Sequence, residues 1–272
     1  MSLLELKPTQ HQQKLSVLVP VHNLGDSILE NIQLLISEIE PYFQSYEVLI
    51  ISNGSTDETN QKLRAFQHPK CRMIIIPETI GKGNSIRRGF FEAQGEYILF
   101  IDGGMELHPR EIRIFFGLMS LYDADIVLGS KRHPQSEIEY PLIRRFLSGI
   151  YQMMLRYFFD LDVTDTQVGL KLFKRKVVED VRELMEVGGY GFDLEVLALA
   201  KLKGHGKMLE APVRLDYFDK NRRRGLAELL HVFRVGWSVM ADTMRVYRKV
   251  IHLRKERADW KSDQPGPIKI NR

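Results

Sequence analysis

Short apolar runs alternate with helical patterns along the first half of the chain. The runs are long enough for buried strands and lie at residues 15–21, 46–52, 71–77, 97–102 and 124–130. Between the first two runs, aliphatic residues recur at the helical spacings of three and four; they are Ile28, Ile32, Leu35, Ile36 and Ile39. Further helical patterns cover residues 82–93 and follow Pro109. Continuously apolar strands are buried on both faces, so the pattern predicts an α/β fold, with a mostly parallel sheet and helices on both faces.

The pattern changes after residue 130. A long helix with arginines among aromatic and aliphatic residues is predicted at 142–159, followed by a turn and strand at 164–175. A helix at 192–202 and a short strand pair at 207–217 come next. Over 225–253, apolar residues recur at helical spacing with basic residues between them, which predicts a basic amphipathic helix.

These patterns divide the chain into four parts. We expect an N-terminal extension over 1–13, one α/β domain over 14–224, a basic amphipathic helix over 225–254 and a disordered tail over 255–272. The chain has 272 residues, of which 44% are hydrophobic and 27% charged, and this is sufficient for one large globular domain with an extension.

The sequence also indicates the cellular compartment of the protein. The single cysteine, Cys71, excludes an intrachain disulfide. No basic and then apolar leader opens the chain, and no stretch of about 18 uncharged apolar residues suggests a membrane span. We therefore expect a reducing, cytoplasmic setting.

Positive charge is concentrated near the C-terminus. From Lys201 onward there are 18 lysines and arginines against 8 aspartates and glutamates, a net charge of +10, whereas the preceding residues sum to −6. Such a basic face suits phosphate-rich ligands, nucleic acid or an anionic membrane, and its alternative is a solvated helix face. The basic residues fall on an amphipathic helix and no nucleic-acid motif is present, so we expect peripheral membrane association and no nucleic acid. Packing of the apolar stripe on the sheet, or on a second subunit of a homo-oligomer, is the alternative.

Polar and glycine-rich segments follow several of the predicted strands. The chain has neither a GxxxxGK[ST] phosphate loop nor a GxGxxG after its first strand, which argues against a P-loop NTPase and a standard dinucleotide binder. The second strand ends in SNGSTDET at 52–59, where Asn53 and Gly54 suit a tight turn and the hydroxyl residues after them suit a helix cap. The fourth run ends on Asp102, and open α/β sheets bind ligands beyond the carboxyl ends of their strands.

Four segments, in this order, resemble the family 2 glycosyltransferases of the GT-A fold. They are VPVHN at 19–23, SNGSTDET at 52–59, GKGNSIRRG at 81–89 and DGG at 102–104. Four later segments are similar to the polyprenyl-phosphate sugar synthases, in particular the dolichyl-phosphate glucose and mannose synthases; they are GSKRH at 129–133, DTQVGLKLFKR at 165–175, GYGFDLEVLALA at 189–200 and NRRRG at 221–225. The second of these most resembles the glucose branch, and the likeness covers residues 14–230.

The resemblance implies an inverting transferase that moves a hexose, glucose or mannose, from a nucleotide-sugar to a polyprenyl or dolichyl phosphate at the membrane surface. Displacement at the acetal carbon expels a nucleoside diphosphate, so the charge of the leaving group must be neutralised and the donor held in line. The acceptor phosphate is already anionic at pH 7. No strong general base is therefore required, in agreement with the absence of an obvious poised histidine.

On the donor side, the resemblance implies contacts from Pro20, Asn23, Asn53, Lys82, Gly83 and Asp102. Asn53 stands against the nucleobase, where the family usually has aspartate. Because an amide both donates and accepts hydrogen bonds, we expect an altered base preference. Lys82 begins a helix between two glycines, as suits a diphosphate ligand; a solvated lysine after a turn is the alternative.

The resemblance makes Lys131, Arg132 and Arg222 candidates for contacts to the acceptor and donor phosphates, because guanidinium forks bind phosphate oxygens bidentately. Gln167 and Lys171 match the acceptor motif. Asp165 matches it as well and joins Asp102 as a candidate catalytic residue, with turn capping as the alternative. The segment after Arg222 departs from the family, reading LAE where the related synthases have Glu-Ser-Lys.

A divalent cation, Mg²⁺ or Mn²⁺, is implied by the family's DAD motif. Asp102 aligns with its first aspartate, while Gly104 replaces the second. Glu106 stands two residues further on and could reach back to the metal, so we expect Asp102 and Glu106 to share a weakly held ion when the donor is bound. A solvent-facing Glu106 is the alternative. The histidines form no zinc spacing, and His22 and His108 are expected to be structural.

Other functions remain open at this point. The chain could be a family 2 glycosyltransferase with a different acceptor, either a glycan or a small molecule. It could also be a degenerate nucleotide-sugar binding protein that has lost turnover through the change at Gly104.

Overall fold

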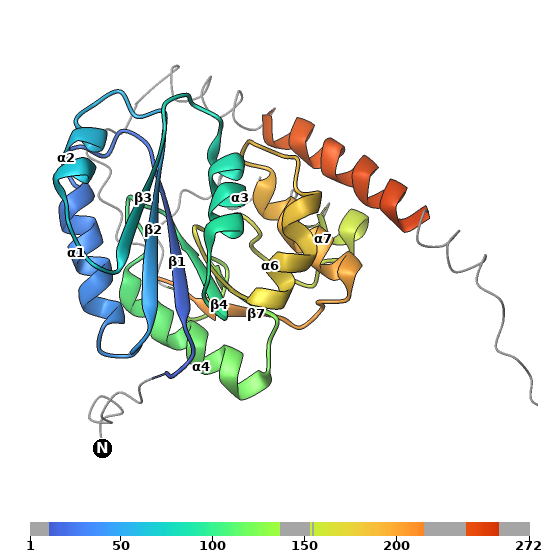
Figure 1. Ribbon diagram of the computed structural model, residues 1–272. Coiled ribbons are helices and arrows are strands. Elements are labelled where there is room, and N and C mark those ends of the chain that lie inside the picture. The colour runs from blue at the N-terminus through green and yellow to red at the C-terminus, as the bar shows by residue number, and fades with distance from the viewer. Residues whose placement is uncertain (1–10, 137–152, 154, 215–237, 256–272) are drawn as a thin grey trace, which may run out of the picture.

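The computed structural model of the protein describes residues 11–136, 153, 155–214 and 238–255 (Figure 1). Several expectations from the sequence fall outside these residues. They are Arg222, most of the N-terminal extension, the first part of both long basic helices, and the tail beyond residue 255.

One sheet runs through the described part of the chain, with seven strands in the order β3-β2-β1-β4-β6-β5-β7. The strands are β1 (Leu15–Val21), β2 (Tyr46–Asn53), β3 (Cys71–Ile76), β4 (Tyr97–Ile101), β5 (Ile126–Ser130), β6 (Leu170–Lys174) and β7 (Met208–Pro212). Neighbouring strands are parallel except that β6 runs antiparallel to both β4 and β5. The predicted mostly parallel sheet is therefore confirmed.

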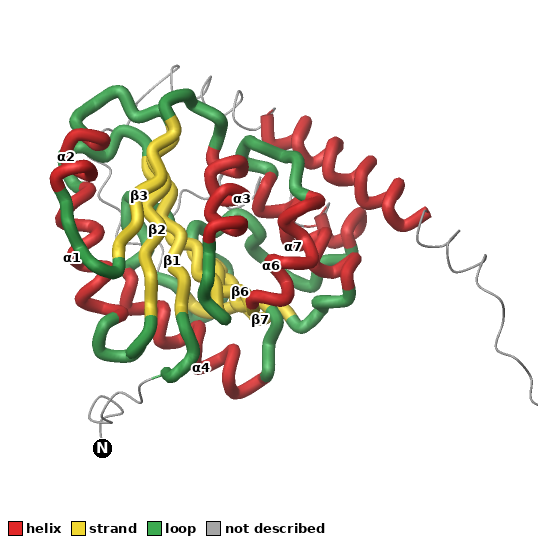
Figure 2. Tube along the Cα trace, in the orientation of Figure 1, coloured by secondary structure: helices red, strands yellow, loops and turns green. Residues whose placement is uncertain are grey.

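Helices lie on both sides of this sheet (Figure 2). They are α1 (Ile28–Ile39), α2 (Thr59–Ala65), α3 (Lys82–Glu92), α4 (Ile112–Tyr122), α6 (Arg175–Val181), α7 (Phe192–Lys203) and a C-terminal helix at 238–255, with 3-10 turns at Pro109–Glu111 and Arg182–Leu184. Figure 1 shows α1 and α2 on one side of the first three strands and α3 on the other.

The order of the first four strands creates a switch point. The chain moves from β1 to β2 to β3 in one direction, and α3 then returns it to β4 on the opposite side of β1. Ligands of open α/β sheets bind beyond the carboxyl ends of the strands at such a reversal. The fold thus brings the loops after β1, β2 and β4 together, as the sequence predicted.

The core explains why these segments form these elements. The five aliphatic residues predicted for one face of α1 are all buried, with at most 8% of their surface exposed. The strands β1, β2 and β4 are almost continuously buried, because helices cover both faces of the sheet.

The turn and strand predicted at 164–175 are present, with the strand at Leu170–Lys174. One predicted element differs from the structure. The strand pair predicted at 207–217 is wrong for residues 208–214, where β7 instead pairs in parallel with the distant β5. An apolar strand pattern identifies a buried strand but not its partner.

The C-terminal helix packs against the domain. Val246 and Val250 are 0% and 2% exposed, and the ring of Tyr247 lies 4.9 Å from that of Phe158. Met240 and Met244 on the same helix are 41% and 51% exposed. Part of the apolar stripe therefore packs on the domain, as in the alternative interpretation, and part of it faces outward. Among the described helices, none is both long and apolar enough to cross a membrane.

Candidate active site

The loop after β1 is tied to the loop after β2. Asn23, with φ of +52°, donates its backbone N–H to Ser55 Oγ at 3.1 Å and accepts from the backbone N–H of Thr56 at 2.8 Å. The carboxylate of Asp57 accepts from the amides of Gly25, at 2.8 Å, and Thr59, at 3.0 Å. Desolvation raises the pKa of Asp57, but these hydrogen bonds outweigh it and the pKa is lowered overall. The backbone amide at the start of α2 thus donates to the carboxylate of Asp57. The prediction that a hydroxyl side chain caps this helix is wrong.

Asn53 is fixed by the backbone on both sides. It is 7% exposed, and its Oδ1 accepts from the amide of Ile80 at 2.8 Å. His22 Nδ1 donates to its carbonyl oxygen at 2.7 Å, so His22 has the structural role expected of it. The next residue, Gly54, has φ of +63°, and a Cβ there would come within 2.3 Å of Thr79, which explains why the tight turn needs glycine. Oδ1 keeps a second lone pair and Nδ2 has two donor hydrogens, so the side chain can still both accept and donate.

Lys82 and Asp102, predicted to meet at the donor, form an ion pair across the switch point. Lys82 begins α3, Asp102 follows β4, and Lys82 Nζ lies 2.6 Å from Asp102 Oδ1. Their side chains are 28% and 38% exposed, so the pair is open to solvent. Burial lowers the pKa of Lys82, but the carboxylates of Asp102 and Asp193 outweigh this and raise it overall. The site therefore presents a fully charged ammonium beside a carboxylate.

A second ion pair lies beneath the first. Lys171 Nζ lies 2.5 Å from Asp193 Oδ1 and donates to the carbonyl of Val168. The two side chains are 1% and 6% exposed, and burial raises the pKa of the Asp193 carboxyl despite the opposing effect of Lys171. In this conformation Lys171 therefore has no access to an acceptor phosphate, in contrast to the sequence-based prediction.

The sequence analysis missed Asp193, although a signal was present. The segment FDLEVLALA is apolar on every side of its helix, and such helices are buried. The burial of the two acidic residues within it could therefore have been predicted, and buried carboxylates require partners.

Asp165 is held in a turn. Its Oδ2 accepts from the amide of Lys131 at 3.1 Å, and its Oδ1 accepts from the amide of Gln167 at 3.2 Å. The turn is fixed further by Glu210 on β7, which accepts from the amides of Thr164 and Asp165. These contacts match the turn-capping alternative. The carboxylate positions Lys131 and Gln167, and its catalytic role stays a prediction.

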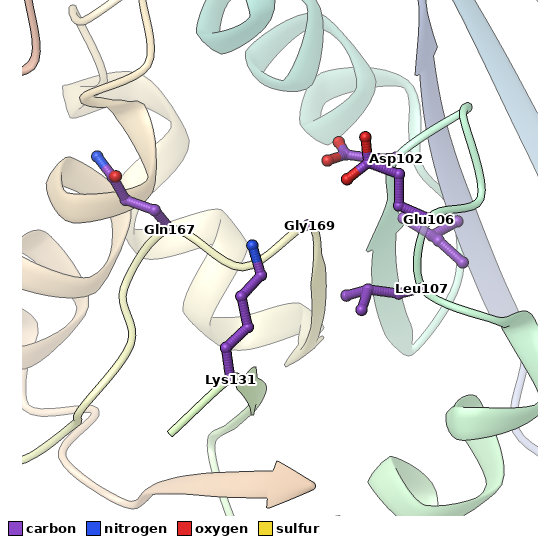
Figure 3. Close-up of a pocket in the computed structure, with 7 residues that line it drawn as sticks. Asp102, Glu106, Leu107, Lys131, Gln167 and Gly169 are labelled. Carbon is purple, nitrogen blue, oxygen red and sulfur yellow. The ribbon is translucent and has the colours of Figure 1, made fainter. Parts of the chain in front are cut away.

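A cavity at the switch point gathers residues from both halves of the predicted site. It is lined by Ile101, Asp102, Glu106, Leu107, Lys131, Gln167 and Gly169. Figure 3 shows Asp102 and Glu106 on one wall, with Lys131 and Gln167 across from them. Four of the predicted site residues, Asp102, Glu106, Lys131 and Gln167, thus line one cavity.

Position 169, at the floor of this cavity, must be glycine because it lies directly against Asp102. The amide of Asp102 donates to the carbonyl of Gly169 at 3.0 Å, and a Cβ on Gly169 would lie 2.1 Å from Asp102 Oδ2. Real side chains do not tolerate such a contact, so the glycine allows Asp102 to lie against the start of β6. By contrast, a Cβ at Gly104, where the family has its second aspartate, would meet nothing within 4 Å.

The family model for Glycosyl transferase family 2 matches residues 16–182. The chain belongs to this family. It is 27% identical over 229 residues to the dolichyl-phosphate beta-glucosyltransferase of Saccharomyces cerevisiae, covering 76% of this chain and 68% of that protein. It is 28% identical over 206 residues to the human dolichyl-phosphate beta-glucosyltransferase, covering 70% of this chain and 63% of that protein.

The fold is shared with solved structures of this class. Glucosyl-3-phosphoglycerate synthase from Mycobacterium tuberculosis, solved with Mn²⁺, UDP and glucosyl-3-phosphoglycerate, superposes with a TM-score of 0.62 at 20% identity. The match covers 86% of this chain and 80% of that one. At this identity the likeness shows the fold, and the predicted GT-A fold is confirmed.

Replacement of Gly169 by alanine tests the close contact with Asp102. We expect Gly169→Ala to lower the free energy of unfolding by about 1–3 kcal/mol, because the strand or the carboxylate must move. Gly117→Ala is the matched control, since a Cβ at this exposed helical position would meet nothing within 4 Å; alanine there should stabilise by about 0.5–1 kcal/mol. Urea unfolding of both variants provides the measurement, and equal stability of Gly169→Ala and the parent would contradict the contact.

Proposed function

We propose that this glycosyltransferase moves a hexose, in the first instance glucose, from a nucleotide-sugar to a polyprenyl phosphate. The observation that carries the proposal is the single cavity in which Asp102 and Glu106 lie across from Lys131 and Gln167. The relatives described as dolichyl-phosphate beta-glucosyltransferases, from yeast and human, support glucose and a lipid phosphate.

The donor half of the site acts through charge and position. Lys82, at the start of α3, offers its ammonium to the diphosphate, and its partly exposed pair with Asp102, which lines the cavity, keeps it charged. The side chain of Asn53, held by the amide of Ile80, offers its Nδ2 donor and the second lone pair of Oδ1 to the base. An ammonium placed there stabilises the leaving diphosphate as the sugar bond breaks.

The described residues fit a divalent ion only with help from the substrate. No group of three or more histidine, cysteine, aspartate or glutamate residues suited to a metal occurs among them. Asp102 and Glu106 offer carboxylate oxygens at the cavity, and Mg²⁺ commonly takes one or two carboxylates together with substrate phosphates and water. A divalent ion held by these two residues would neutralise the leaving diphosphate. Because Lys82 already contacts Asp102 Oδ1, it competes with the ion for that oxygen, which explains why we expect weak binding without donor.

The acceptor half needs no strong base. A phosphate monoester is anionic at pH 7 and attacks directly once it is held in line with the sugar. Lys131 and Arg132 lie at the end of β5, where Asp165 fixes the backbone of Lys131. Asp165 therefore serves the acceptor by positioning, and the site requires no proton transfer from it. Arg222, predicted to join them, lies outside the described residues.

Peripheral attachment to a membrane would bring the lipid phosphate to this site. The described ends of the two predicted basic helices expose Met153, Tyr157, Met240 and Met244, with between 41% and 84% of each residue exposed. Arg245 and Arg248 are exposed on the same helix as Met240 and Met244. Exposed apolar and basic side chains on one helix suit the interface of an anionic bilayer.

The donor assignment is tested by Lys82→Ala. We expect its affinity for UDP-glucose, measured by calorimetry, to fall about 10- to 150-fold, since a charge-assisted contact is worth about 1.5–3 kcal/mol. Arg88→Ala is the control, because Arg88 lies on the same helix but pairs with Glu92 on the surface. Transfer of labelled glucose to dolichyl phosphate should fall with donor affinity in Lys82→Ala alone. Unchanged affinity would remove Lys82 from the site, and donor binding without transfer to any acceptor would favour the degenerate binding protein.

The role of the metal is tested by chelation and by variants of the two carboxylates. We expect transfer to be lost in EDTA and restored by Mn²⁺, and Asp102→Asn and Glu106→Gln to need more Mn²⁺ for half-maximal rate. Glu179→Gln, on the surface of α6, should leave the Mn²⁺ requirement unchanged. Full activity in EDTA would instead make the cationic side chains the sole ligands of the diphosphate.

Membrane attachment is tested by sedimentation with vesicles that contain phosphatidylserine. We expect binding at low salt that weakens as salt is added, because each basic residue near an anionic surface contributes about 1 kcal/mol. Serine at both Met240 and Met244 should weaken binding, whereas Leu121→Ser, at an exposed position on α4, should not. Absence of binding at low salt would exclude this surface as a membrane contact.

A further inference from the structure

The turn that carries Lys82 lies directly against another segment of backbone. The amide of Gly83 donates to the carbonyl of Gly188 at 2.9 Å. Gly81 has φ of +89°, and a Cβ there would lie 2.3 Å from that same carbonyl oxygen, while a Cβ at Gly83 would lie 2.2 Å from the carbonyl oxygen of Val187. We name residues 81–83 the donor turn and residues 184–191 the wall segment. The position of the donor turn is set by the wall segment.

The wall segment has no regular structure at its centre and is held by one buried carboxylate. Glu195, on α7, is fully buried and accepts from the amides of Glu186, at 3.0 Å, and Val187, at 2.9 Å. Helix α3 has no side-chain hydrogen bond at its N-terminus, so the carbonyl of Gly188 supplies the acceptor for its first turn. Glu195 thus fixes the strip of backbone that receives the donor turn.

The charge of Glu195 is balanced from the C-terminal helix. Lys249 Nζ lies 3.0 Å from Glu195 Oε1 and 3.2 Å from Glu186 Oε1, and it also donates to the carbonyl of Leu184. Its side chain is only 14% exposed. Two turns earlier on the same helix, Asp242 accepts from the amide of Gly191 at 3.2 Å. The C-terminal helix therefore contacts both ends of the wall segment.

We propose that Lys249 and Glu195 are positioning residues for the donor turn. Neither lines the cavity, and both act by fixing the wall segment on which Lys82 and its glycines lie. The inference rests on the proposed function only in that the donor turn is taken to hold the donor diphosphate.

The position of the wall segment is sensitive to the loss of either charge in the Lys249–Glu195 pair. A buried carboxylate without its cation either takes up a proton or draws in water, and in both cases it binds two backbone amides less well. Loss of the Lys249 ammonium should therefore loosen the wall segment and, through Gly188, the donor turn. A displacement of about 1 Å in a group that holds a substrate can cost on the order of 100-fold in rate.

Hydrogen exchange of the full-length protein without ligand tests the proposal independently of any substrate. We expect Lys249→Met to speed amide exchange about tenfold or more in residues 81–88 and 184–195, with little change in α1, since local opening exposes only the amides it releases. Lys249→Arg retains the charge and should protect both segments as the parent does. Lys255→Met is the matched control, because it removes a positive charge that is exposed on the same helix.

Donor affinity supplies the second measurement. The Michaelis constant for UDP-glucose should rise about tenfold in Lys249→Met and stay unchanged in Lys255→Met, while the constant for lipid phosphate is unchanged in both. Faster exchange that is equal in α1 and in residues 81–88 would overturn the proposal, because it would show global destabilisation alone. Unchanged exchange in residues 81–88 would overturn it as well.

If exchange changes as expected but no variant or parent binds a nucleotide-sugar, the coupling stands and the proposed function fails. If Lys249→Met does not fold, the same exchange comparison is made with Lys249→Gln. Exchange that rises equally in α1 and residues 81–88, or that does not change in residues 81–88, would overturn the proposal for this variant as well.

Discussion

Because β1 pairs in parallel with β2 on one side and with β4 on the other, the loops after all three strands leave the sheet at one edge. The contacts on the donor side of the site depend on this arrangement. It sets Asn23 against the loop after β2, places Asp102 opposite the start of α3, and leaves an opening at the reversal of strand order. The antiparallel strand β6 then brings the turn before it, with Gln167 and Gly169, to the same edge.

Two lysine–aspartate ion pairs follow one another from the interior of the molecule to the cavity. Lys171 pairs with Asp193 under the floor, and Lys82 pairs with Asp102 above it. The two ammonium groups and two carboxylates together carry no net charge. An arriving diphosphate can pair with Lys82, and a divalent ion with Asp102, without leaving an unbalanced charge in the interior. The inner pair is buried, and the carboxylate of Asp193 helps to raise the pKa of Lys82. A neutral but separable pair is a suitable resting state for a site that binds and releases an anionic leaving group.

Local features were predictable from the sequence, whereas partners distant in the chain were not. The buried face of α1, the strands β1 to β5 and the clustering of Asp102, Glu106, Lys131 and Gln167 were anticipated from spacing and motif order. The direction of β6, the partner of β7 and the burial of Lys171 were not, because each depends on a neighbour far away in the chain. The amphipathic pattern of the C-terminal helix was real, but an apolar stripe has the same composition whether it meets lipid or protein. Only the structure separates Val246 and Val250, which pack inward, from Met240 and Met244, which face outward.

The position of β6 has a consequence for synthesis on the ribosome. β4 lies between β1 and β6, and Ile101 pairs with Leu170, which leaves the tunnel 69 residues later. At about 5–20 residues per second, the outer edge of β4 stays unpaired for several seconds after β1 to β4 have emerged. An open apolar edge of this kind is a template for pairing with other chains. The nascent protein is thus most exposed to aggregation in the interval before β6 emerges, and a chaperone that shields β4 during that interval would raise the yield of folded enzyme.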